Sequence, residues 1–344
     1  MISDVIFHIA VGVIRNNKNQ VLLSLRSSTV HQPDLWEFPG GKLEPGETVS
    51  EALSRELNEE LALTVKSAQP LIQIHHDYDE YSVLLDVWNV DSWDSDSLDG
   101  NERVGKEGQV IEWVDISKLD ERDYPEANKP IIKAVKLPKL YLICPEPEGD
   151  TKGYLKKFEE CISAGITLFQ LRFSDDSLYD RNESLITELI ELCRSSNSIL
   201  MINSSPEYAV KVGATGVHLN STRLLQLDKR PLDNNFLVSA SCHNFSELEH
   251  AANIDVDFLV LSPVNRTTSH QTVDPLGWEH FKTLIEPFPI PTYALGGMQA
   301  DDMKKSCECG GQGISVLSGV WNQKDTKNAV AKYLQGTISQ KINL

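Results

Sequence analysis

The sequence predicts an α/β protein built from two domains, and three observations support this. The chain has 344 residues, more than one hydrophobic core usually spans. An acidic loop-and-helix pattern marks its first quarter, whereas short apolar runs alternate with helix-like stretches in the second half. Between them, a basic segment containing Pro138 predicts the end of a helix. We therefore expect domains at 1–135 and 140–344, joined by a linker at 136–139.

The second half contains eight short apolar runs of strand length. Their residues do not alternate between apolar and polar, which indicates strands buried on both faces. Helices fit between successive runs, and about 200 residues of eight βα units are typical of a (β/α)₈ (TIM) barrel. The runs are Leu140 to Cys144, Thr167 to Phe173, Ile199 to Asn203, Gly216 to Leu219, Phe236 to Ser241, Asp257 to Val264, Pro291 to Gly296 and Gly313 to Leu317.

In the first half, a helix is predicted to begin at about Val49. Thr48, followed three residues later by Glu51, is the pattern of a capping box. Val49, Leu53 and Leu57 recur at helical spacing and would form the buried stripe of this helix.

Two glutamates fall on that same stripe. At the helical period, Glu56 and Glu60 lie within roughly 20° of Val49. Two carboxylates near the protein interior are costly unless a cation or a proton compensates them. Mg²⁺ does so well, because it takes carboxylate oxygens and completes its shell with water and phosphate oxygens. The alternative is a solvated acidic face, which remains open for Glu51 or Glu59 taken alone.

The polar pattern from Gly41 to Leu63 resembles the Nudix box, with Ala62 as the single departure where that family has Gly. The resemblance to the MutT-type branch, the 8-oxo-dGTP diphosphatases, extends from Val11 to Pro130. It implies an α/β/α sandwich with a mixed sheet and a Mg²⁺-dependent pyrophosphohydrolase, in which Mn²⁺ is expected to substitute. The matching segments are Ala10 to Asn16, Trp36 to Lys42, Gly105 to Gln109 and Ala127 to Pro130.

The same resemblance implies the site residues. Its catalytic set would be Arg55, Glu56, Glu59, Glu60 and Glu107, with Arg55 orienting carboxylates and Glu107 as a metal ligand or general base. Metal and phosphates would be surrounded by Gly40, Glu56, Glu59, Glu60 and Glu107. The nucleotide would be bound by Arg26, His31, Glu37, Phe38, Lys42 and Asn128.

Several of these residues have a competing structural interpretation. An aromatic residue such as Phe38 at a strand end is often part of the core, although its ring can also stack on a purine. Asn128 lies between two prolines, where Asn commonly forms a turn. As a buried amide it would instead discriminate a purine edge, because the wrong base would leave polar groups unpaired. Glu107 lies in a Gly-Lys-Glu-Gly loop that would ordinarily be exposed.

Residues 140–321 resemble the thiamine phosphate synthase and thiazole tautomerase family. The resemblance rests on Tyr141-Leu-Ile, Gln170-Leu-Arg172, Gly216-Val-His-Leu219, Ser241-Cys-His243, Ser262-Pro263 and Ala294-Leu-Gly-Gly-Met298. It implies a barrel phosphate site, which would bind a thiamine-precursor phosphate. The candidate residues of that site are Gln170, Arg172, Gly297, Ser318 and Gly319. The alternative for Gly297 is that it only permits a tight turn.

The second half departs from a working synthase at four positions. The synthase holds Mg²⁺ with two aspartates, and here those positions read Ser204 and Arg223. Two phosphate-binding lysines are replaced by Ser174 and His270. We therefore expect no synthase activity, because displacing pyrophosphate without the metal would lose most of its electrostatic stabilisation. Tautomerase chemistry needs only an acid-base group, for which His218, His243 and His270 are candidates.

Composition narrows the partners. The formal charge of −18 argues against binding a nucleic acid polymer, whereas a free nucleotide delivered with Mg²⁺ remains compatible. The six cysteines form neither a C-x-x-C pair nor a dense framework, so we expect reduced thiols and no structural zinc. No apolar run is long enough to span a membrane and no signal peptide is visible, so we expect a cytoplasmic location without membrane binding. Residues 91–102 are expected to form a solvated acidic loop.

The expected function is hydrolysis of 8-oxo-dGTP to 8-oxo-dGMP and pyrophosphate, which would sanitise the nucleotide pool and avoid mutation. A second hypothesis keeps the Nudix chemistry but takes a thiamine-pathway pyrophosphate as substrate, because a thiamine-type barrel is fused to the domain. For the barrel alone, a non-catalytic phosphate-ligand module or a scaffold remains open.

Overall fold

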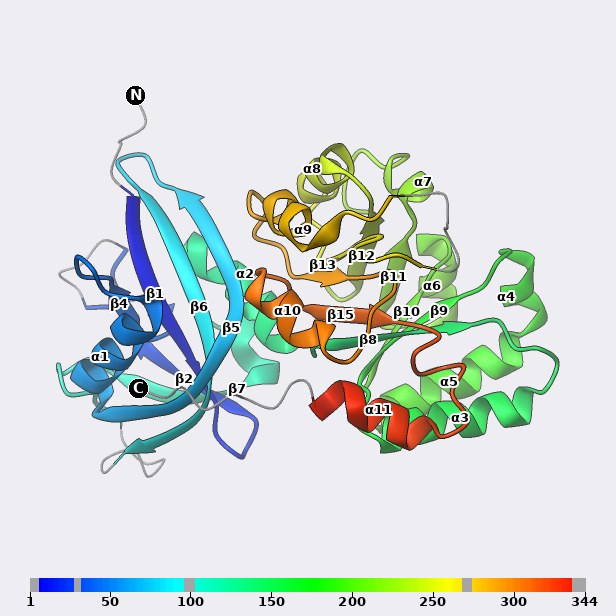
Figure 1. Ribbon diagram of the computed structural model, residues 1–344, viewed down its shortest axis with the longest axis horizontal. Coiled ribbons are helices and arrows are strands. Elements are labelled where there is room, and N and C mark those ends of the chain that lie inside the picture. Colours follow the sequence, from blue (N-terminus) through cyan, green and yellow to red (C-terminus); the bar gives the residue numbers. More distant parts are fainter. Residues whose placement is uncertain (1–5, 28–31, 96–102, 268–273, 336–344) are drawn as a thin grey trace. The chain divides into compact units, whose positions relative to one another are not determined.

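The computed structural model describes residues 6–27, 32–95, 103–267 and 274–335. The described residues up to Lys136 form one compact unit, and those from Leu137 onward form a second (Figure 1). The division falls inside the segment expected to be the linker. Within the described residues, no helix is both long and apolar enough to cross a membrane.

The first unit contains a mixed sheet and a smaller antiparallel one. The mixed sheet has the order β4-β1-β6-β5, in which β1 and β6 are parallel, and the second sheet has the order β3-β2-β7. The strands are β1 (Ile6–Ile14), β2 (Gln20–Leu25), β3 (Trp36–Glu37), β4 (Gly40–Lys42), β5 (Leu63–Asp77), β6 (Ser82–Ser95) and β7 (Ile111–Asp115).

Two helices pack on opposite sides of the mixed sheet (Figure 1). On one side, α1 (Val49–Leu61) buries Leu53 and Leu57. On the other, α2 (Lys129–Lys136) buries Ile131 and Val135, and two short 3-10 helices (Ile116–Glu121 and Glu126–Asn128) precede it. This α/β/α arrangement confirms the predicted fold of the first unit.

The predicted N-terminus of α1 is confirmed. Thr48 caps the helix, and its hydroxyl accepts from the Glu51 backbone N–H at 3.3 Å while the Glu51 carboxylate accepts from the Thr48 N–H at 2.8 Å. The helix ends at Ala62, which adopts the left-handed conformation with φ 52° and ψ 34°. This is the position where the Nudix box has Gly, and only Gly adopts that conformation without steric cost.

One element of the first unit differs from expectation. The acidic loop was expected to begin at Asp91, but β6 continues through Ser95. Residues 92–95 pair with β5, and the side chains of Asp91 and Asp94 are exposed, so the acidic composition marks an exposed strand end there. The remainder of that loop, residues 96–102, lies outside the described residues.

The second unit is a closed barrel of eight parallel strands, which confirms the predicted architecture (Figure 1). The strands follow the predicted runs to within three residues at each end, because most residues of each run are buried and turn residues bound it. They are β8 (Leu140–Pro145), β9 (Leu168–Arg172), β10 (Ile199–Ile202), β11 (Gly216–Leu219), β12 (Leu237–Cys242), β13 (Phe258–Leu261), β14 (Thr292–Ala294) and β15 (Gly313–Val316).

The barrel helices lie outside the strands and bury one face each (Figure 1). They are α3 (Thr151–Ser163), α4 (Ser177–Arg181), α5 (Glu183–Ser195), α6 (Pro206–Val212), α7 (Ser221–Leu224), α8 (Phe245–Asn253), α9 (Gly277–Ile285), α10 (Asp302–Glu308) and α11 (Thr326–Gln335). All six cysteines of the chain lie in this unit as buried free thiols.

Candidate active site

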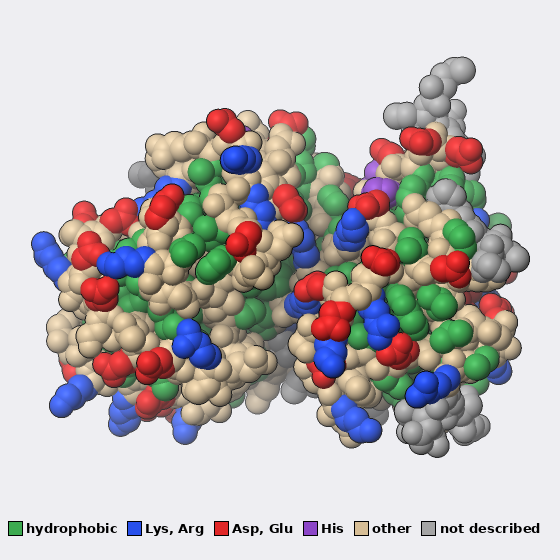
Figure 2. Space-filling view, turned by 180° about the vertical axis from the view of Figure 1, so that it is seen from behind, with side chains coloured by type: hydrophobic (Ala, Val, Ile, Leu, Met, Phe, Trp, Pro, Cys, Tyr) green, Lys and Arg blue, Asp and Glu red, His purple; other side chains and the backbone are tan. Residues whose placement is uncertain are grey.

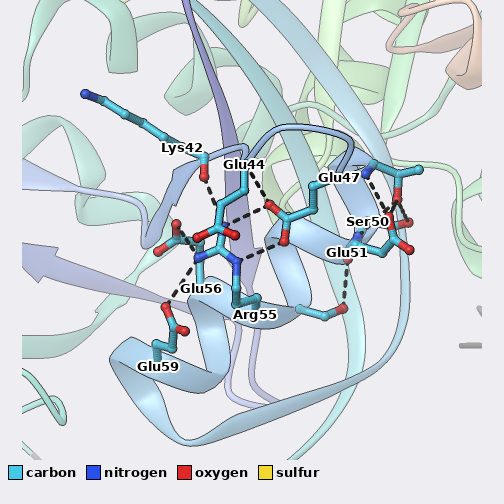
Figure 3. Close-up of polar contacts among 10 residues, drawn as sticks. Lys42, Glu44, Glu47, Ser50, Glu51, Arg55, Glu56 and Glu59 are labelled. Atoms are coloured by element: carbon cyan, nitrogen blue, oxygen red, sulfur yellow. Dashed lines mark hydrogen bonds and ion pairs between the residues drawn. The ribbon is translucent and has the colours of Figure 1, made fainter.

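Arg55 is the centre of the polar cluster on α1 (Figure 3). Its Nε and Nη2 donate to the two carboxylate oxygens of Glu47, each at 2.9 Å. Its Nη1 donates to Glu56 at 2.8 Å and to Glu59 at 3.3 Å, and Nη2 also donates to the Lys42 carbonyl at 3.0 Å. All five N–H donors of the guanidinium are therefore used, and three carboxylates are fixed by one cation.

These contacts shift the pKa values of Arg55 and Glu47. Hydrogen bonds to Glu47 and Glu56 raise the pKa of Arg55 further above its ordinary value. The hydrogen bond from Arg55, followed by the one from the Glu44 backbone, lowers the pKa of Glu47. Glu47 thus stays ionised and anchors the arginine.

The pKa of Glu60 is shifted upward, in the direction opposite to that of Glu47. Burial, followed by the charges of Glu37 and Glu56, raises the pKa of Glu60 to about 8, although the Gly40 N–H donates to its carboxylate at 3.2 Å. Glu107 contributes in the same direction. A carboxylate held among other carboxylates in a partly buried place is a position where a cation would relieve the repulsion.

Two adjacent glycines allow this crowding. A Cβ atom on Gly41 would lie 2.2–2.4 Å from the carboxyl atoms of Glu56. A Cβ atom on Gly40, whose φ is 148°, would lie 2.1 Å from the Ala10 carbonyl oxygen. The backbone of β4 can therefore approach Glu56 because Gly41 lacks a side chain, and it can pair closely with β1 because Gly40 lacks one.

Glu107 reaches the same neighbourhood from another segment. The Lys106 N–H donates to the Glu60 carbonyl at 2.8 Å, and the Gln109 amide donates to the same carbonyl at 3.3 Å. The loop is therefore fastened to the end of α1, and the Glu107 side chain is exposed beside it.

The oxygen-only donor set fits a hard divalent cation. The carboxylates come from Glu56, Glu59, Glu60 and Glu107. The backbone of Gly40 lies beside them, since its N–H donates to Glu60. Among the described residues, no three acidic, His or Cys side chains already converge tightly enough to hold an ion. Mg²⁺ needs no such closed set, because it commonly takes one or two carboxylates and fills its shell with water and phosphate oxygens.

The residues expected to bind the nucleotide lie in different surroundings. Arg26 pairs with Glu37 and donates through Nε to the Gln32 carbonyl at 3.1 Å. Burial raises the pKa of Glu37, and Arg26 partly offsets this. The Lys42 ammonium lies 3.7 Å from the centre of the Phe7 ring, and its side chain extends away from the glutamates (Figure 3). His31 lies outside the described residues.

Asn128 and Phe38 are both buried, at 8% and 3% exposure. The Phe38 N–H donates to the Asn128 amide oxygen at 3.4 Å, and the Phe38 ring stacks on Tyr124 with 6.4 Å between centroids. This packing matches the core interpretation of Phe38. Within the described parts of the chain, the Asn128 amide nitrogen has no hydrogen-bond partner, so its donors are available to a ligand.

The sequence did not predict the parts that two residues, Tyr78 and Glu47, play in the candidate site. Tyr78, on the turn between β5 and β6, bonds to the Ala127 backbone beside Asn128, and its ring lies 5.1 Å from that of Tyr81. Glu47 was recognised only as part of the box, although it is the main partner of Arg55. The Tyr-x-x-Tyr spacing at a hairpin turn is a signal that could have indicated the aromatic pair.

In the barrel, four of the five candidate phosphate residues lie at the carboxyl ends of strands, and three of these adjoin two neighbouring strands. Gly297 follows β14, and Ser318 and Gly319 follow β15, which is the neighbouring strand. Gly297 has φ 67°, and a Cβ atom there would lie 2.3 Å from the Arg266 carbonyl. Arg172 is exposed at the end of β9. Gln170 is buried inside the barrel, where it donates to Tyr141 at 2.9 Å, and so belongs to an internal network.

The candidate acid-base histidines differ in access. His218 is completely buried, and its two ring nitrogens each lie 2.8 Å from a serine hydroxyl, Ser239 and Ser241. Burial, and then the charge of Arg172, lowers the pKa of His218 to about 3, so it stays neutral as part of the core. His243 is exposed and its Nδ1 lies 2.8 Å from the Ser262 carbonyl. His270 lies outside the described residues.

Comparison with known proteins gives the same division. The NUDIX domain family matches residues 10–134, and the thiamine monophosphate synthase family matches residues 140–320.

Among curated relatives, an 8-oxo-dGTP diphosphatase of Escherichia coli is 37% identical over 37% of this chain and 95% of its own length. A putative thiamine-phosphate synthase 2 of Aquifex aeolicus is 31% identical over 54% of this chain and 98% of its own. A thiamine-phosphate synthase of Fusobacterium nucleatum is 27% identical over 57% of this chain and 96% of its own. The chain therefore belongs to the Nudix hydrolases through its first unit and to the thiamine monophosphate synthase family through its second.

Proposed function

We propose that the first unit hydrolyses 8-oxo-dGTP to 8-oxo-dGMP and pyrophosphate in a Mg²⁺-dependent reaction, as part of nucleotide-pool sanitation. The observation that carries this proposal is the set of glutamates that Arg55 holds beside Glu60. The 37% identity to an 8-oxo-dGTP diphosphatase over nearly that protein's whole length supports the choice of substrate.

Each residue of the set has a distinct part in the proposed reaction. Glu56, Glu59, Glu60 and Glu107 would hold the metal, which when bound neutralises polyphosphate charge and lowers the pKa of a bound water. Arg55 keeps Glu56 and Glu59 oriented. Glu107, exposed on its loop, is the residue we assign to accept the proton of the attacking water if it is not a ligand.

The purine would be recognised at Asn128. Its amide nitrogen offers donors, while its oxygen is already engaged by the Phe38 N–H. A base lacking the matching acceptor would leave those donors unpaired in a buried place, which gives strong discrimination. The aromatic pair Tyr78 and Tyr81 lies on the turn nearest this amide and offers faces for base stacking.

The test is the turnover of a Glu60→Gln variant. We expect kcat for 8-oxo-dGTP to fall by orders of magnitude while the protein stays folded, since Gln retains the shape but cannot hold the cation. Glu51→Gln is the matched control, because Gln also completes a capping box and should leave turnover unchanged. Near wild-type turnover in Glu60→Gln would refute the proposal.

A second substrate class is favoured by the fusion itself. The barrel belongs to the thiamine monophosphate synthase family, so a thiamine-pathway pyrophosphate is the natural competitor of 8-oxo-dGTP. Competition between thiamine diphosphate and 8-oxo-dGTP for hydrolysis separates the two substrates.

For the barrel, we propose binding of a phosphorylated thiamine precursor or product without synthase activity. Gly297, Ser318 and Gly319 follow neighbouring strands at the carboxyl edge, where barrels commonly bind phosphate. Thiamine phosphate and thiazole phosphate should each raise the unfolding temperature, and Gly297→Val should abolish that rise. The absence of any shift with these ligands would favour a scaffold.

A further inference from the structure

The Mg²⁺-binding positions of the synthase family do not fit a metal in this chain. Ser204 and Arg223 stand where the resemblance calls for two aspartates. A hydroxyl is a weak ligand for Mg²⁺, and a guanidinium repels a cation.

Arg223 is fixed in its position from two sides. Its Nη2 donates to Asp176 at 2.6 Å, and the other oxygen of Asp176 accepts from the Ser204 hydroxyl at 2.8 Å. Its Nη1 donates to the amide oxygen of Asn203 at 3.4 Å. Both substituted positions thus share one carboxylate, so the two replacements form a single arrangement.

A chain of hydrogen bonds connects this arrangement to the barrel interior. The Asn203 amide donates to Gln170 at 3.1 Å, and Gln170 donates to the Tyr141 hydroxyl at 2.9 Å. Asn203, Gln170 and Tyr141 are all buried. The acceptor end of Asn203 is therefore held toward Arg223, which limits the rotamers available to the guanidinium.

The guanidinium retains capacity for a ligand. Arg223 uses two of its five N–H donors, which leaves three without a partner in the described part of the chain. Its side chain is 23% exposed and follows the carboxyl end of β11, the side of the barrel on which ligands bind. Arg172, exposed at the end of β9, adds a second positive charge at the same edge.

We propose that Arg223 is a built-in cation that replaces the divalent metal, so that the barrel binds a second anionic group of its ligand without Mg²⁺. A fixed guanidinium can donate two parallel hydrogen bonds to phosphate oxygens, whereas Mg²⁺ would have to be recruited with the ligand. The proposal rests on the proposed ligand binding by the barrel and adds its metal independence. The ligand class is a diphosphate, or a phosphate ester with a further anionic group.

The test uses the full-length protein in EDTA with inorganic pyrophosphate as probe and calorimetric titration as readout. EDTA removes divalent metal from the Nudix site, so that site contributes no metal-dependent binding. We expect wild type to bind pyrophosphate in EDTA and Arg223→Gln to weaken binding by about tenfold or more, which is about 1.4 kcal/mol. Arg194→Gln is the matched control. Arg194 is exposed in the last turn of α5, which leads into the amino end of β10, so it lies toward the opposite end of the barrel from Arg223.

Two further variants keep the test decisive. Arg223→Lys keeps the charge but loses the planar fork, so its affinity should lie between those of wild type and Arg223→Gln. Ser204→Asp combined with Arg223→Asp should bind pyrophosphate only when Mg²⁺ is added. Nudix hydrolysis should be unchanged in all of them, which reports correct folding of the chain.

The outcomes also separate this inference from the barrel function on which it rests. Suppose that thiamine phosphate binds in EDTA. If pyrophosphate then binds only with Mg²⁺, or if pyrophosphate binds Arg223→Gln as tightly as it binds wild type, Arg223 does not replace the metal, and the proposed ligand binding by the barrel still holds. If neither compound binds under any condition, both proposals fail.

Discussion

The surroundings of Glu60 disfavour its charged form. Its pKa is raised to about 8, mainly by burial and then by Glu37 and Glu56. Such a carboxyl group is protonated at neutral pH in the metal-free protein and becomes ionised when a cation binds beside it. Metal binding at this place should therefore release a proton.

The metal-free protein should consequently lose stability as the pH rises. Between pH 4.5, the ordinary pKa of Glu, and about 8, folded Glu60 keeps a proton that the unfolded chain has lost. The free energy of unfolding then falls with rising pH. Urea unfolding in EDTA at pH 5 and pH 8 should show a larger fall for wild type than for Glu60→Gln, and Mg²⁺ should restore wild type at pH 8. An identical fall in both proteins would contradict this assignment.

Arg55 should not tolerate replacement by lysine. Five hydrogen bonds hold Glu47, Glu56, Glu59 and the Lys42 carbonyl, and an ammonium has three donors in a different geometry. A misplacement of about 1 Å can cost about 100-fold in rate, so Arg55→Lys should lower kcat for 8-oxo-dGTP by about that factor. Steady-state kinetics checks this, and an unchanged kcat would show that the fork is not needed.

For single residues, the sequence predicted which residue types belong to the candidate site, but it did not predict which side chains they contact. The spacing of Glu56 and Glu60 places both on one face of a helix whatever the fold, so a metal site could be inferred from the sequence. Phe38 and Lys42 could not be assigned in this way. Their contacts with Tyr124 and Phe7 depend on how distant segments pack.

The helix α1 shows how an element positions the site. Its capping box at Thr48 fixes the first turn, and the left-handed Ala62 ends the last one. Four of the five proposed catalytic residues lie between these two ends, and the fifth, Glu107, lies on a loop that is hydrogen-bonded to the Glu60 carbonyl.

Replacing Ala62 by glycine should stabilise the protein. Ala62 has φ 52°, a conformation that costs about 1–2 kcal/mol for a residue with a Cβ atom, whereas Gly adopts it freely. The larger entropy of unfolded Gly offsets part of this gain, so we expect Ala62→Gly to raise the free energy of unfolding by about 1 kcal/mol. Denaturant unfolding measures it. The same change at helical Ala52 should destabilise instead, and a loss of stability in both variants would contradict the argument.

Elements with a strong local pattern were predictable from the sequence. The eight barrel strands are largely buried on both faces and bounded by turn residues, so their positions follow from the order of apolar and turn residues along the sequence. By contrast, β3 and β4 contain two and three residues, too few to show any periodicity. Their pairing with β2 and β1 needs tertiary contacts.

The chain combines two units, and each has its own candidate site. The candidate catalytic and nucleotide-binding residues lie between Arg26 and Asn128, and the candidate phosphate-binding residues of the barrel lie between Gln170 and Gly319. On the face seen in Figure 2, basic side chains stand among acidic ones and do not gather into a continuous patch. Together with a net charge of −18, this favours small phosphorylated ligands over a nucleic acid polymer.

Because the two sets share no residue, each should be removable alone. Glu60→Gln should abolish hydrolysis and leave the thermal shift with thiamine phosphate in EDTA unchanged. Gly297→Val should abolish that shift and leave hydrolysis unchanged. Loss of both properties in either variant, with the fold intact by circular dichroism, would reveal coupling between the units.

Hydrolysis of 8-oxo-dGTP, dGTP and thiamine diphosphate by the purified protein, with Mg²⁺ and at low micromolar substrate, distinguishes nucleotide-pool sanitation from a role in cofactor metabolism. Released pyrophosphate and phosphate would both be measured. We predict a strong preference for 8-oxo-dGTP with release of pyrophosphate, because we assign recognition of the purine edge to the amide of Asn128, which is buried and accepts from the Phe38 N–H. A preference for thiamine diphosphate would contradict nucleotide-pool sanitation and would assign the hydrolase to cofactor metabolism.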